Sequence, residues 1–236
     1  MHLLLDHAGY LPQFIDLTAA KAHEVQILKK LALDSGKIIV FDRGLIDFAT
    51  WAKWINEGVF FVTRMKSNAA YRIVHRNQVV ERSHVVKDQL IHLSVFYSKK
   101  KCPYALRMVV YIDPDTGKKY EFITNNMTLA ASTIAAIYKD QWQIEIFFKA
   151  LKQNFRIKTF VSTSFNAIMI QIWTALIAIL ILKYLKAKSK MSWSLANLVA
   201  MVRMNLLTYV DLWHWLDHPY YSPPIPDEAI QECFAF

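Results

Sequence analysis

Tyr138-Lys-Asp-Gln-Trp-Gln-Ile-Glu145-Ile-Phe-Phe-Lys149-Ala-Leu-Lys152 contains neither glycine nor proline, and this predicts a helix. At about 100° per residue, one narrow stripe of that helix gathers a phenol, an amide, a carboxylate and two amines. The stripe consists of Tyr138, Gln141, Glu145, Lys149 and Lys152. An apolar stripe beside it predicts packing against a core, and it consists of Ile137, Ile144, Phe148, Leu151 and Phe155.

A single carboxylate among cations suits a metal ion held together with a phosphodiester. The metal needs the carboxylate, and the phosphate needs the cations. A solvated helix face with Glu145 and Lys149 paired one turn apart would give the same pattern. The residues of this stretch alone leave both interpretations open.

The totals narrow the class of protein. A chain of 236 residues can form one large or two small domains, and 54% hydrophobic and 14% aromatic residues exclude disorder as its main state. The formal net charge of +9 favours a polyanionic partner, such as nucleic acid, a ribosome or an anionic membrane. Cys102 and Cys233 are isolated, which indicates neither a disulfide framework nor a zinc site and suits a reducing interior.

A second candidate site follows the apolar run Lys37-Ile-Ile-Val-Phe41, which predicts a strand buried on both faces of a mixed sheet. Asp42 falls at the carboxyl end of this strand, where ligands gather in open α/β sheets. An Asp that ends a strand before a turn is the alternative. Asp47 is interpreted as the N-cap of the next helix.

The neighbouring segments complete this half of the chain. Residues 2–18 are predicted to form a hairpin, with Asp6 as a turn residue rather than a catalytic acid. Thr18 is predicted to cap a helix that extends to about Asp34. Val59–Thr63 is the next predicted strand, and Arg64 and Lys66 after it could meet phosphates.

Short antiparallel strands are predicted between residues 67 and 126. Residues 63–107 contain ten Lys or Arg and two acids, including the run Lys99-Lys100-Lys101. This basic stretch could face DNA or could be an ordinary solvated surface.

Helices are predicted for most of residues 127–205. The stretch quoted above is expected to be one helix from Thr128 or Ser132 to about Phe155, with Arg156 and Lys158 extending its basic end. The apolar run Ala167–Leu182 predicts a buried core helix, with a membrane span as the alternative. Ser192 or Ser194 opens a further helix, and residues 206–236 are acidic and rich in proline.

Two boxes carry a resemblance to a known family. The spacing of Tyr138, Gln141, Glu145 and Lys152 resembles the Tyr-Arg-Glu-Lys signature of IS4-type transposases, with Gln141 in place of the Arg. Asp42-Arg43-Gly44 with Asp47 resembles the second-aspartate box of the same family. These enzymes are DDE recombinases, which cut and join DNA with two metal ions.

The resemblance implies an α/β fold, a ribonuclease-H-like mixed sheet flanked by helices and interrupted by a basic antiparallel β insertion. The first catalytic strand of the family would precede the hairpin and is expected to be absent from these residues. The implied divisions are a partial core at 1–66, the β insertion at 67–126, completion of the core at 127–205 and an acidic, Pro-rich tail at 206–236.

The resemblance also implies the site. Asp42 and Glu145 would be catalytic and bind Mg²⁺, or Mn²⁺, and Trp142 is a candidate for the aromatic residue that assists base flipping. The implied DNA contacts are Tyr138, Gln141, Lys149, Lys152, Arg43, Arg64 and Lys66. Because the third carboxylate would lie on the absent strand, we expect a chain that binds metal weakly and does not transpose alone.

The implied partner is double-stranded DNA at transposon ends, bound by a homodimer in the bacterial cytoplasm at the nucleoid, with no membrane. Two other classes stay open. One is a noncatalytic DNA-binding fragment, and the other is a single-span membrane protein.

Overall fold

The computed structural model describes residues 2–7, 9–16, 25–66, 68–79, 83–154 and 164–221. The chain forms two compact units, Met1–Ile146 and Phe147–Phe236. Several residues singled out above lie outside the described ones, namely Thr18, Phe155, Arg156, Lys158, Cys233 and the end of the tail from 222 onward.

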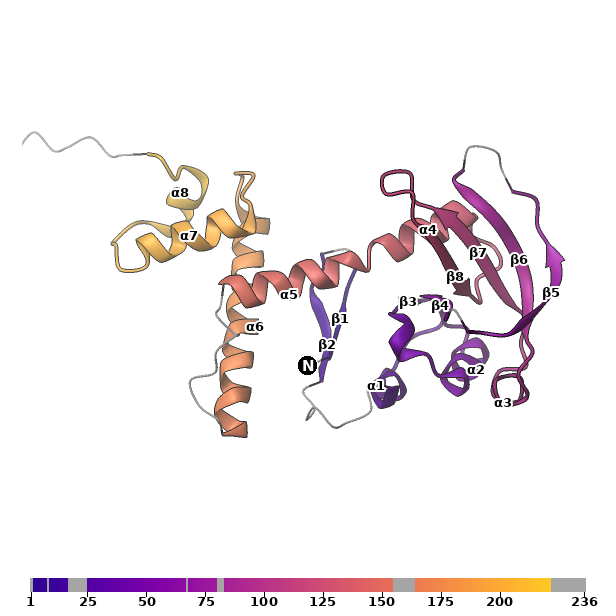
Figure 1. Cartoon of the computed structure of the whole chain (residues 1–236). Coiled ribbons are helices and arrows are strands. Elements are labelled where there is room, and N and C mark those ends of the chain that lie inside the picture. Colours follow the sequence, from indigo (N-terminus) through magenta and orange to yellow (C-terminus); the bar gives the residue numbers. More distant parts are fainter. Residues whose placement is uncertain are drawn as a thin grey trace, which may run out of the picture. The chain divides into compact units, whose positions relative to one another are not determined.

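The first unit is a mixed α/β structure built on a six-stranded sheet of order β3-β4-β8-β7-β6-β5 (Figure 1). The strands are β1 (His2–Leu5), β2 (Pro12–Asp16), β3 (Ile38–Val40), β4 (Phe60–Arg64), β5 (Tyr71–Arg76), β6 (Val85–Leu93), β7 (Leu106–Ile112) and β8 (Lys119–Thr124). The helices are α1 (Val25–Lys30), the short η1 (Arg43–Leu45), α2 (Phe48–Asn56), α3 (Phe96–Lys101), α4 (Ala131–Lys139) and the start of α5 (Trp142–Asn154). β3 and β4 are parallel and the other sheet pairs are antiparallel, so the predicted mixed sheet flanked by helices is confirmed.

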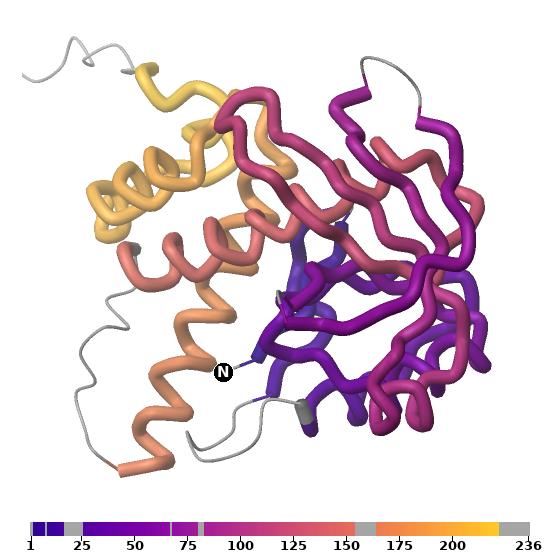
Figure 2. The backbone as a smooth tube through the Cα atoms, turned by 45° about the vertical axis from the view of Figure 1, so that its right-hand side comes forward, coloured from indigo at the N-terminus to yellow at the C-terminus, as the bar shows by residue number. Residues whose placement is uncertain are grey.

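The central strands are buried on both faces. Successive side chains of a strand point to opposite faces, and each face packs against a core cluster. Phe61 and Ile123 pack with Trp51 and Trp54 of α2 in the larger core cluster. Their neighbours in sequence, Val62 and Phe122, join Ile134 of α4 in a cluster on the other face. α1, α2 and α3 therefore cover one face of the sheet, and α4 covers the other (Figure 2).

β3 departs from its prediction. It is the terminal strand of the sheet, and only one of its faces is fully buried. Ile39 and Phe41 are buried, whereas Val40 is half-buried and Ile38 is 38% exposed. An apolar run of three to five residues does not distinguish a central strand from an edge strand that packs on one side.

The predicted hairpin at the start of the chain is confirmed, since β1 and β2 pair antiparallel. Asp47 is the N-cap of α2, as predicted, and its carboxylate accepts from the Thr50 amide. α1 ends at Lys30, however, four residues before the predicted end. The Lys99-Lys100-Lys101 run lies on helix α3 and not within a strand.

The predicted single helix is broken. α4 ends at Lys139 and α5 begins at Trp142. Between them the amide of Gln141 donates to Tyr138 O, and the amide of Ile144 donates to Gln141 O, three residues back in each case. These hydrogen bonds to the third residue back replace the bonds to the fourth residue back of an α-helix. The spacing of apolar and polar side chains is nearly the same in both cases, so it did not predict the break.

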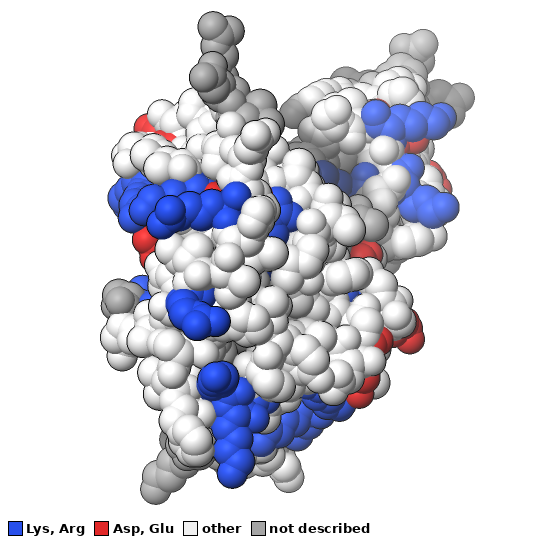
Figure 3. All heavy atoms as spheres, turned by 90° about the vertical axis from the view of Figure 1, so that its right-hand side faces the viewer, with Lys and Arg blue, Asp and Glu red and all other residues white. Residues whose placement is uncertain are grey.

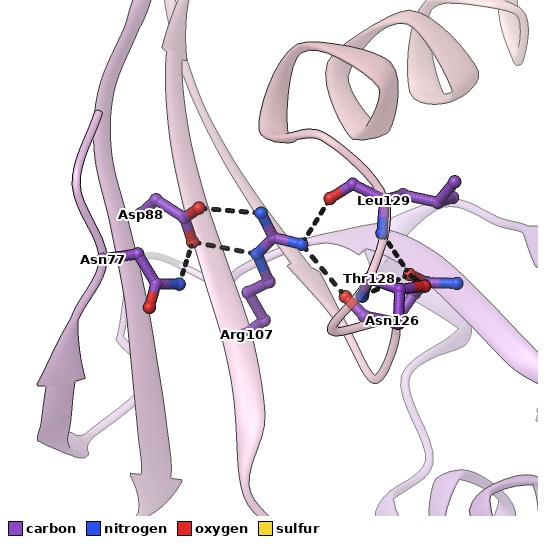
Figure 4. Close-up of polar contacts among 6 residues, drawn as sticks. All are labelled: Asn77, Asp88, Arg107, Asn126, Thr128 and Leu129. Carbon is purple, nitrogen blue, oxygen red and sulfur yellow. Dashed lines mark hydrogen bonds and ion pairs between the residues drawn. The ribbon is translucent and has the colours of Figure 1, made fainter. Parts of the chain in front are cut away.

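A buried ion pair ties β6 and β7 to the segment that leads into α4 (Figure 4). Arg107 donates through Nε and Nη2 to the two carboxylate oxygens of Asp88, at 2.9 and 2.7 Å. Its Nη1 donates to Leu129 O at 2.6 Å. Asn126 Oδ1 accepts hydrogen bonds from the amides of Thr128 and Leu129 in the same segment. The start of α4 is therefore fixed to the sheet by side chains.

The second unit contains the remainder of α5 together with α6 (Phe165–Lys188), α7 (Leu195–Asn205) and α8 (Leu212–Asp217). Leu182 and Leu185 of α6 pack with Leu198 of α7 and Trp215 of α8. Ser194 caps α7, as predicted, but α8 was not expected in the Pro-rich tail.

Of the described helices, α6 is the one whose length and composition would allow it to cross a membrane. Only 22% of its most apolar window is buried, so the prediction of a buried core helix is wrong: most of the apolar side chains of α6 are exposed or half-buried. Length and composition of this kind are shared by core helices of soluble proteins, and one such helix is weak support for a span.

Candidate active site

Asp42 and Arg64 meet because β3 and β4 are parallel neighbours, and each residue lies at the carboxyl end of its strand. Asp42 caps η1, and its Oδ1 accepts from the Arg43 amide at 2.6 Å. The same Oδ1 lies 3.5 Å from Arg64 Nη2. The side chain of Asp42 is 55% exposed and remains open to a further ligand.

Arg64 and Tyr138 form the next contact of the site. The Arg64 guanidinium carbon lies 5.7 Å from the centroid of the Tyr138 ring. Burial would lower the pKa of Arg64, but Tyr138 and Asp42 outweigh it, and the pKa is raised. Burial raises the pKa of Tyr138, and the Arg64 charge only partly offsets this. Tyr138 is therefore a neutral hydrogen-bond donor near physiological pH.

One hydrogen-bond donor of Arg64 is unpaired within the described residues. Its Nε atom is buried and has no hydrogen-bond partner within the described part of the chain. A buried unpaired donor is unfavourable, so an anionic oxygen that reached this atom would be bound well.

Asp42, Arg64, Tyr138, Gln141 and Glu145 line one cavity of about 930 Å³. The two carboxylates come from segments that are remote in sequence, one after β3 and the other in the first turn of α5. The fold thus brings both predicted acids, the phenol and the amide to one hollow on the α4 side of the sheet.

Aromatic rings line the part of this cavity that extends along β7 and β8. Tyr111, Tyr120 and Phe122 contribute to the lining. The rings of Phe122 and Tyr138 are 4.8 Å apart, and those of Tyr120 and Phe122 are stacked at 5.9 Å. Trp142, singled out from the sequence, also lines the cavity and is 61% exposed.

The other predicted DNA contacts lie elsewhere. Arg43 on η1 and Lys66 after β4 are exposed and do not line the cavity. Lys149 and Lys152 are exposed on α5, in the unit that begins at Phe147. The structure therefore groups five of the nine predicted residues around one cavity.

Carboxylates in this cavity determine which metals it could hold. Asp113 and Asp140 also line it. Asp113 Oδ1 accepts hydrogen bonds from the amides of Asp115 and Thr116. Asp140 forms an ion pair with His7 Nε2 at 2.8 Å. Asp42 and Glu145 are left as hard oxygen donors suited to Mg²⁺ or Mn²⁺. No group of three or more His, Cys, Asp or Glu within the described ranges could hold a metal.

Sequence reasoning missed two features of the site. Asp140 and the aromatic wall formed by Tyr111, Tyr120 and Phe122 were not singled out. Tyr120 and Phe122 alternate with Glu121 and Ile123 on β8, which is a common strand pattern. Only the position of α4 over that face gives these rings a role.

Comparisons with known proteins identify the family of the chain. Residues 1–181 match the family described as Transposase DDE domain. A Sinorhizobium fredii protein named as the transposase y4zB is 31% identical over 187 residues, which cover 78% of this chain and 52% of that protein. A Geobacillus stearothermophilus protein named as a transposase for the insertion sequence element IS5377 is 27% identical over 195 residues, 78% of this chain and 50% of that protein.

The chain spans about half the length of the curated relatives that it matches. The family match nevertheless covers most of its 236 residues, including Asp42 and the Tyr138-to-Lys152 stretch. The chain belongs to the family of transposases with a DDE domain.

Proposed function

We propose that this chain is the C-terminal portion of an IS4-type transposase with a ribonuclease-H-like core, and that Asp42 and Glu145 are two of its catalytic carboxylates. The observation that carries the proposal is the shared cavity, in which both acids stand with Arg64 and Tyr138. A relative from Synechocystis, 26% identical over 181 residues, is named as a transposase for the element IS4SA, which supports the IS4 type.

The proposed reaction is cleavage and joining of DNA phosphodiesters. Divalent ions bound by Asp42 and Glu145 would activate the attacking oxygen and stabilise the leaving oxygen. Arg64 would offer its free Nε to a phosphate oxygen, and the protonated Tyr138 would donate to another. Lys149, Lys152, Arg43 and Lys66 would neutralise the flanking DNA backbone, and Gln141 would make a neutral contact.

A two-metal centre needs more carboxylates than the cavity leaves available. We therefore infer that a chain with these residues alone binds metal weakly and does not cut DNA. We also propose that the family's reaction takes place in the bacterial cytoplasm on DNA held by a dimer. The test is nicking of a supercoiled plasmid with Mg²⁺ or Mn²⁺. Background nicking that is equal in the wild type and Asp42→Ala is expected, and robust cleavage lost in Asp42→Ala would show that the chain is active.

A second function, binding DNA without cutting it, is favoured by the cations on the face formed by β5, β6 and α3. Figure 3 shows Lys and Arg gathered there with few acids. In the described part of the chain, none of the five exposed cations of this face is in an ion pair; they are Arg72, Arg76, Lys87, Lys99 and Lys100. Asp88 of the same stretch is buried against Arg107.

Binding of a labelled 30-base-pair duplex over a range of salt concentrations separates the two functions (about three turns of DNA). Arg72→Gln with Arg76→Gln should lower affinity and reduce the salt slope by about 2, because each phosphate contact contributes about 0.9. Asp42→Asn with Glu145→Gln should leave binding unchanged or stronger. A salt slope that neither pair of substitutions alters would remove this face from the DNA interface.

A further inference from the structure

Three consecutive apolar or aromatic residues are exposed at the start of α3. Phe96 is 81% exposed, and its neighbours Val95 and Tyr97 are 51% and 63% exposed. Burial of a phenylalanine ring is a large favourable contribution in most folds, and this fold leaves the ring in water. A contiguous exposed patch of this kind marks a surface that contacts a partner.

The buried side of α3 determines which of its residues face outward. Ser98 and Cys102, one turn apart, are 6% and 1% exposed, and the Cys102 amide donates to Ser98 O at 2.9 Å. At about 100° per residue, Phe96, Lys99 and Lys100 lie on the opposite side of the helix. Both lysines are exposed, and neither is in an ion pair within the described part of the chain. The exposed ring is therefore flanked by two positive charges.

The patch on α3 continues the basic face of β5. Leu93 at the end of β6 pairs with Tyr71, and the Ser94 amide donates to Ala70 O at 3.1 Å. α3 thus follows the sheet beside the start of β5, where Arg72 is exposed. Figure 3 shows this face, on which groups of Lys and Arg alternate with uncharged surface.

We propose that Phe96 stacks on an unpaired base of DNA while Lys99 and Lys100 bind the phosphates on either side of that base. Aromatic rings set among cations are the combination by which proteins hold single strands. The bases of an intact duplex already stack on one another, so the ring can reach a base only in a single strand or at an opened step. The inference rests on the DNA binding proposed for this face, and it names DNA with unpaired bases as the substrate.

An anionic membrane would also attract lysines and an exposed ring. Helices that lie in a membrane surface have a strong apolar face along their length. α3 has six residues, of which three are lysines, so it offers little apolar length to a lipid surface. The chemistry of the patch therefore favours a nucleic acid.

The experiment measures binding of the full chain to two labelled oligothymidine strands of about 12 nucleotides by fluorescence anisotropy. One strand carries all its bases, and the other has abasic sites at its central positions, so the phosphate charge is the same. The wild type should bind the strand with bases about tenfold more tightly, because one aromatic stack contributes about that factor. Phe96→Ala should remove most of this preference and leave the salt slope unchanged, because no phosphate contact is lost.

Phe165→Ala is the matched control. Phe165 is also the first residue of its helix, α6, and is 62% exposed, but Ile168 and Met169 stand where α3 has lysines. This variant should bind both strands as the wild type does. Phe96→Leu keeps an apolar side chain without a ring, and it should lose the preference as Phe96→Ala does.

The lysines have a different expected effect. Lys99→Gln with Lys100→Gln should weaken binding to both strands and reduce the salt slope by about 1.4, because each phosphate contact to a single strand contributes about 0.7. A slope that this pair of substitutions leaves unchanged would overturn their part in the proposal.

An equal preference for bases in the wild type and Phe96→Ala would overturn the role of the ring. Binding to phosphatidylserine vesicles that Phe96→Leu keeps and Phe96→Ala loses, with single-strand binding unaltered in both, would assign α3 to a membrane instead. A chain that binds duplex DNA through Arg72 and Arg76 but shows no preference for bases would refute this inference alone. Failure to bind either kind of DNA would refute the proposed DNA binding as well.

Discussion

Arg64 Nη2 lies 3.5 Å from Asp42 Oδ1, so the carboxylate proposed to bind metal already has a cation beside it. The pair is partly exposed, and pairs of this kind contribute about 1 kcal/mol or less. Arg64 thus competes weakly with a metal ion and, at the same time, offers donors to a phosphate.

Replacing this arginine should have opposite effects on the two ligands. In Arg64→Gln, Mn²⁺ should bind up to about fivefold more tightly, as the loss of a weak competing pair predicts. DNA should bind more weakly, with a salt slope reduced by about 1. Electron paramagnetic resonance titration and fluorescence anisotropy measure the two effects. Arg72→Gln, at the opposite edge of the sheet, removes the same charge and should leave Mn²⁺ binding unchanged. Loss of both affinities in Arg64→Gln would contradict the assignment.

Tyr138 should make folding sensitive to alkaline pH. Burial raises the pKa of this phenol above its ordinary value of about 10, so its contribution to stability is complete below that pH and is lost as pH rises through the folded-state pKa. Tyr138→Phe keeps the ring that contacts Phe122 and should lose less stability between about pH 8 and about pH 10.5 than the wild type does. Urea unfolding at the two pH values measures this. Tyr209→Phe, at a fully exposed position, should behave as the wild type does.

Arg107 should be the most sensitive of the buried charges. Arg107→Ala leaves the Asp88 carboxylate buried without its partner and releases Leu129 O, so we expect a loss of about 3–5 kcal/mol in the free energy of unfolding. Denaturant unfolding measures it. Lys119→Ala breaks an exposed pair with Glu121 and should change stability little. A small effect in Arg107→Ala would mean that the network of Figure 4 does not fix the start of α4.

Gly58 and Gly36 form a matched pair for testing the start of the parallel strands. Both have positive φ, and the Gly36 amide donates to Gly58 O at 2.8 Å. Gly36→Ala meets no neighbour and should destabilise by about 1–2 kcal/mol, the penalty for a side chain in this region.

Gly58→Ala should destabilise more, because its new Cβ would lie 2.5 Å from Ser35 Oγ. Adding Ser35→Ala should restore part of that difference. Thermal unfolding of Gly36→Ala, Gly58→Ala, Ser35→Ala and the Gly58→Ala Ser35→Ala double variant measures the coupling. Equal losses in Gly36→Ala and Gly58→Ala would show that the contact with Ser35 is relieved by rotation.

Local signals in the sequence were sufficient for much of the fold. Asp47 before Phe48, Ser194 before Leu195 and the glycine after the first hairpin strand each follow from capping or turn chemistry, which operates over a few residues. The parallel pairing that brings Asp42 to Arg64 follows from a short apolar strand, a helix and a second apolar strand.

Features that depend on contacts between distant segments were not predictable in this way. Arg107 and Asp88 look like ordinary charges in a basic stretch, and only the pairing of β6 with β7 buries them together. Likewise, the exposure of Ile38 depends on the position of β3 at the end of the sheet, which an apolar run does not encode.

The break between α4 and α5, at Asp140 and Gln141, lies between the Tyr138 phenol and the Glu145 carboxylate. Two residues that advance by about 120° instead of about 100° turn Glu145 by about 40° relative to Tyr138. The direction of the carboxylate is thus set by these two residues, and small torsional changes there would redirect it without moving the Tyr138 ring that is tilted against Phe122.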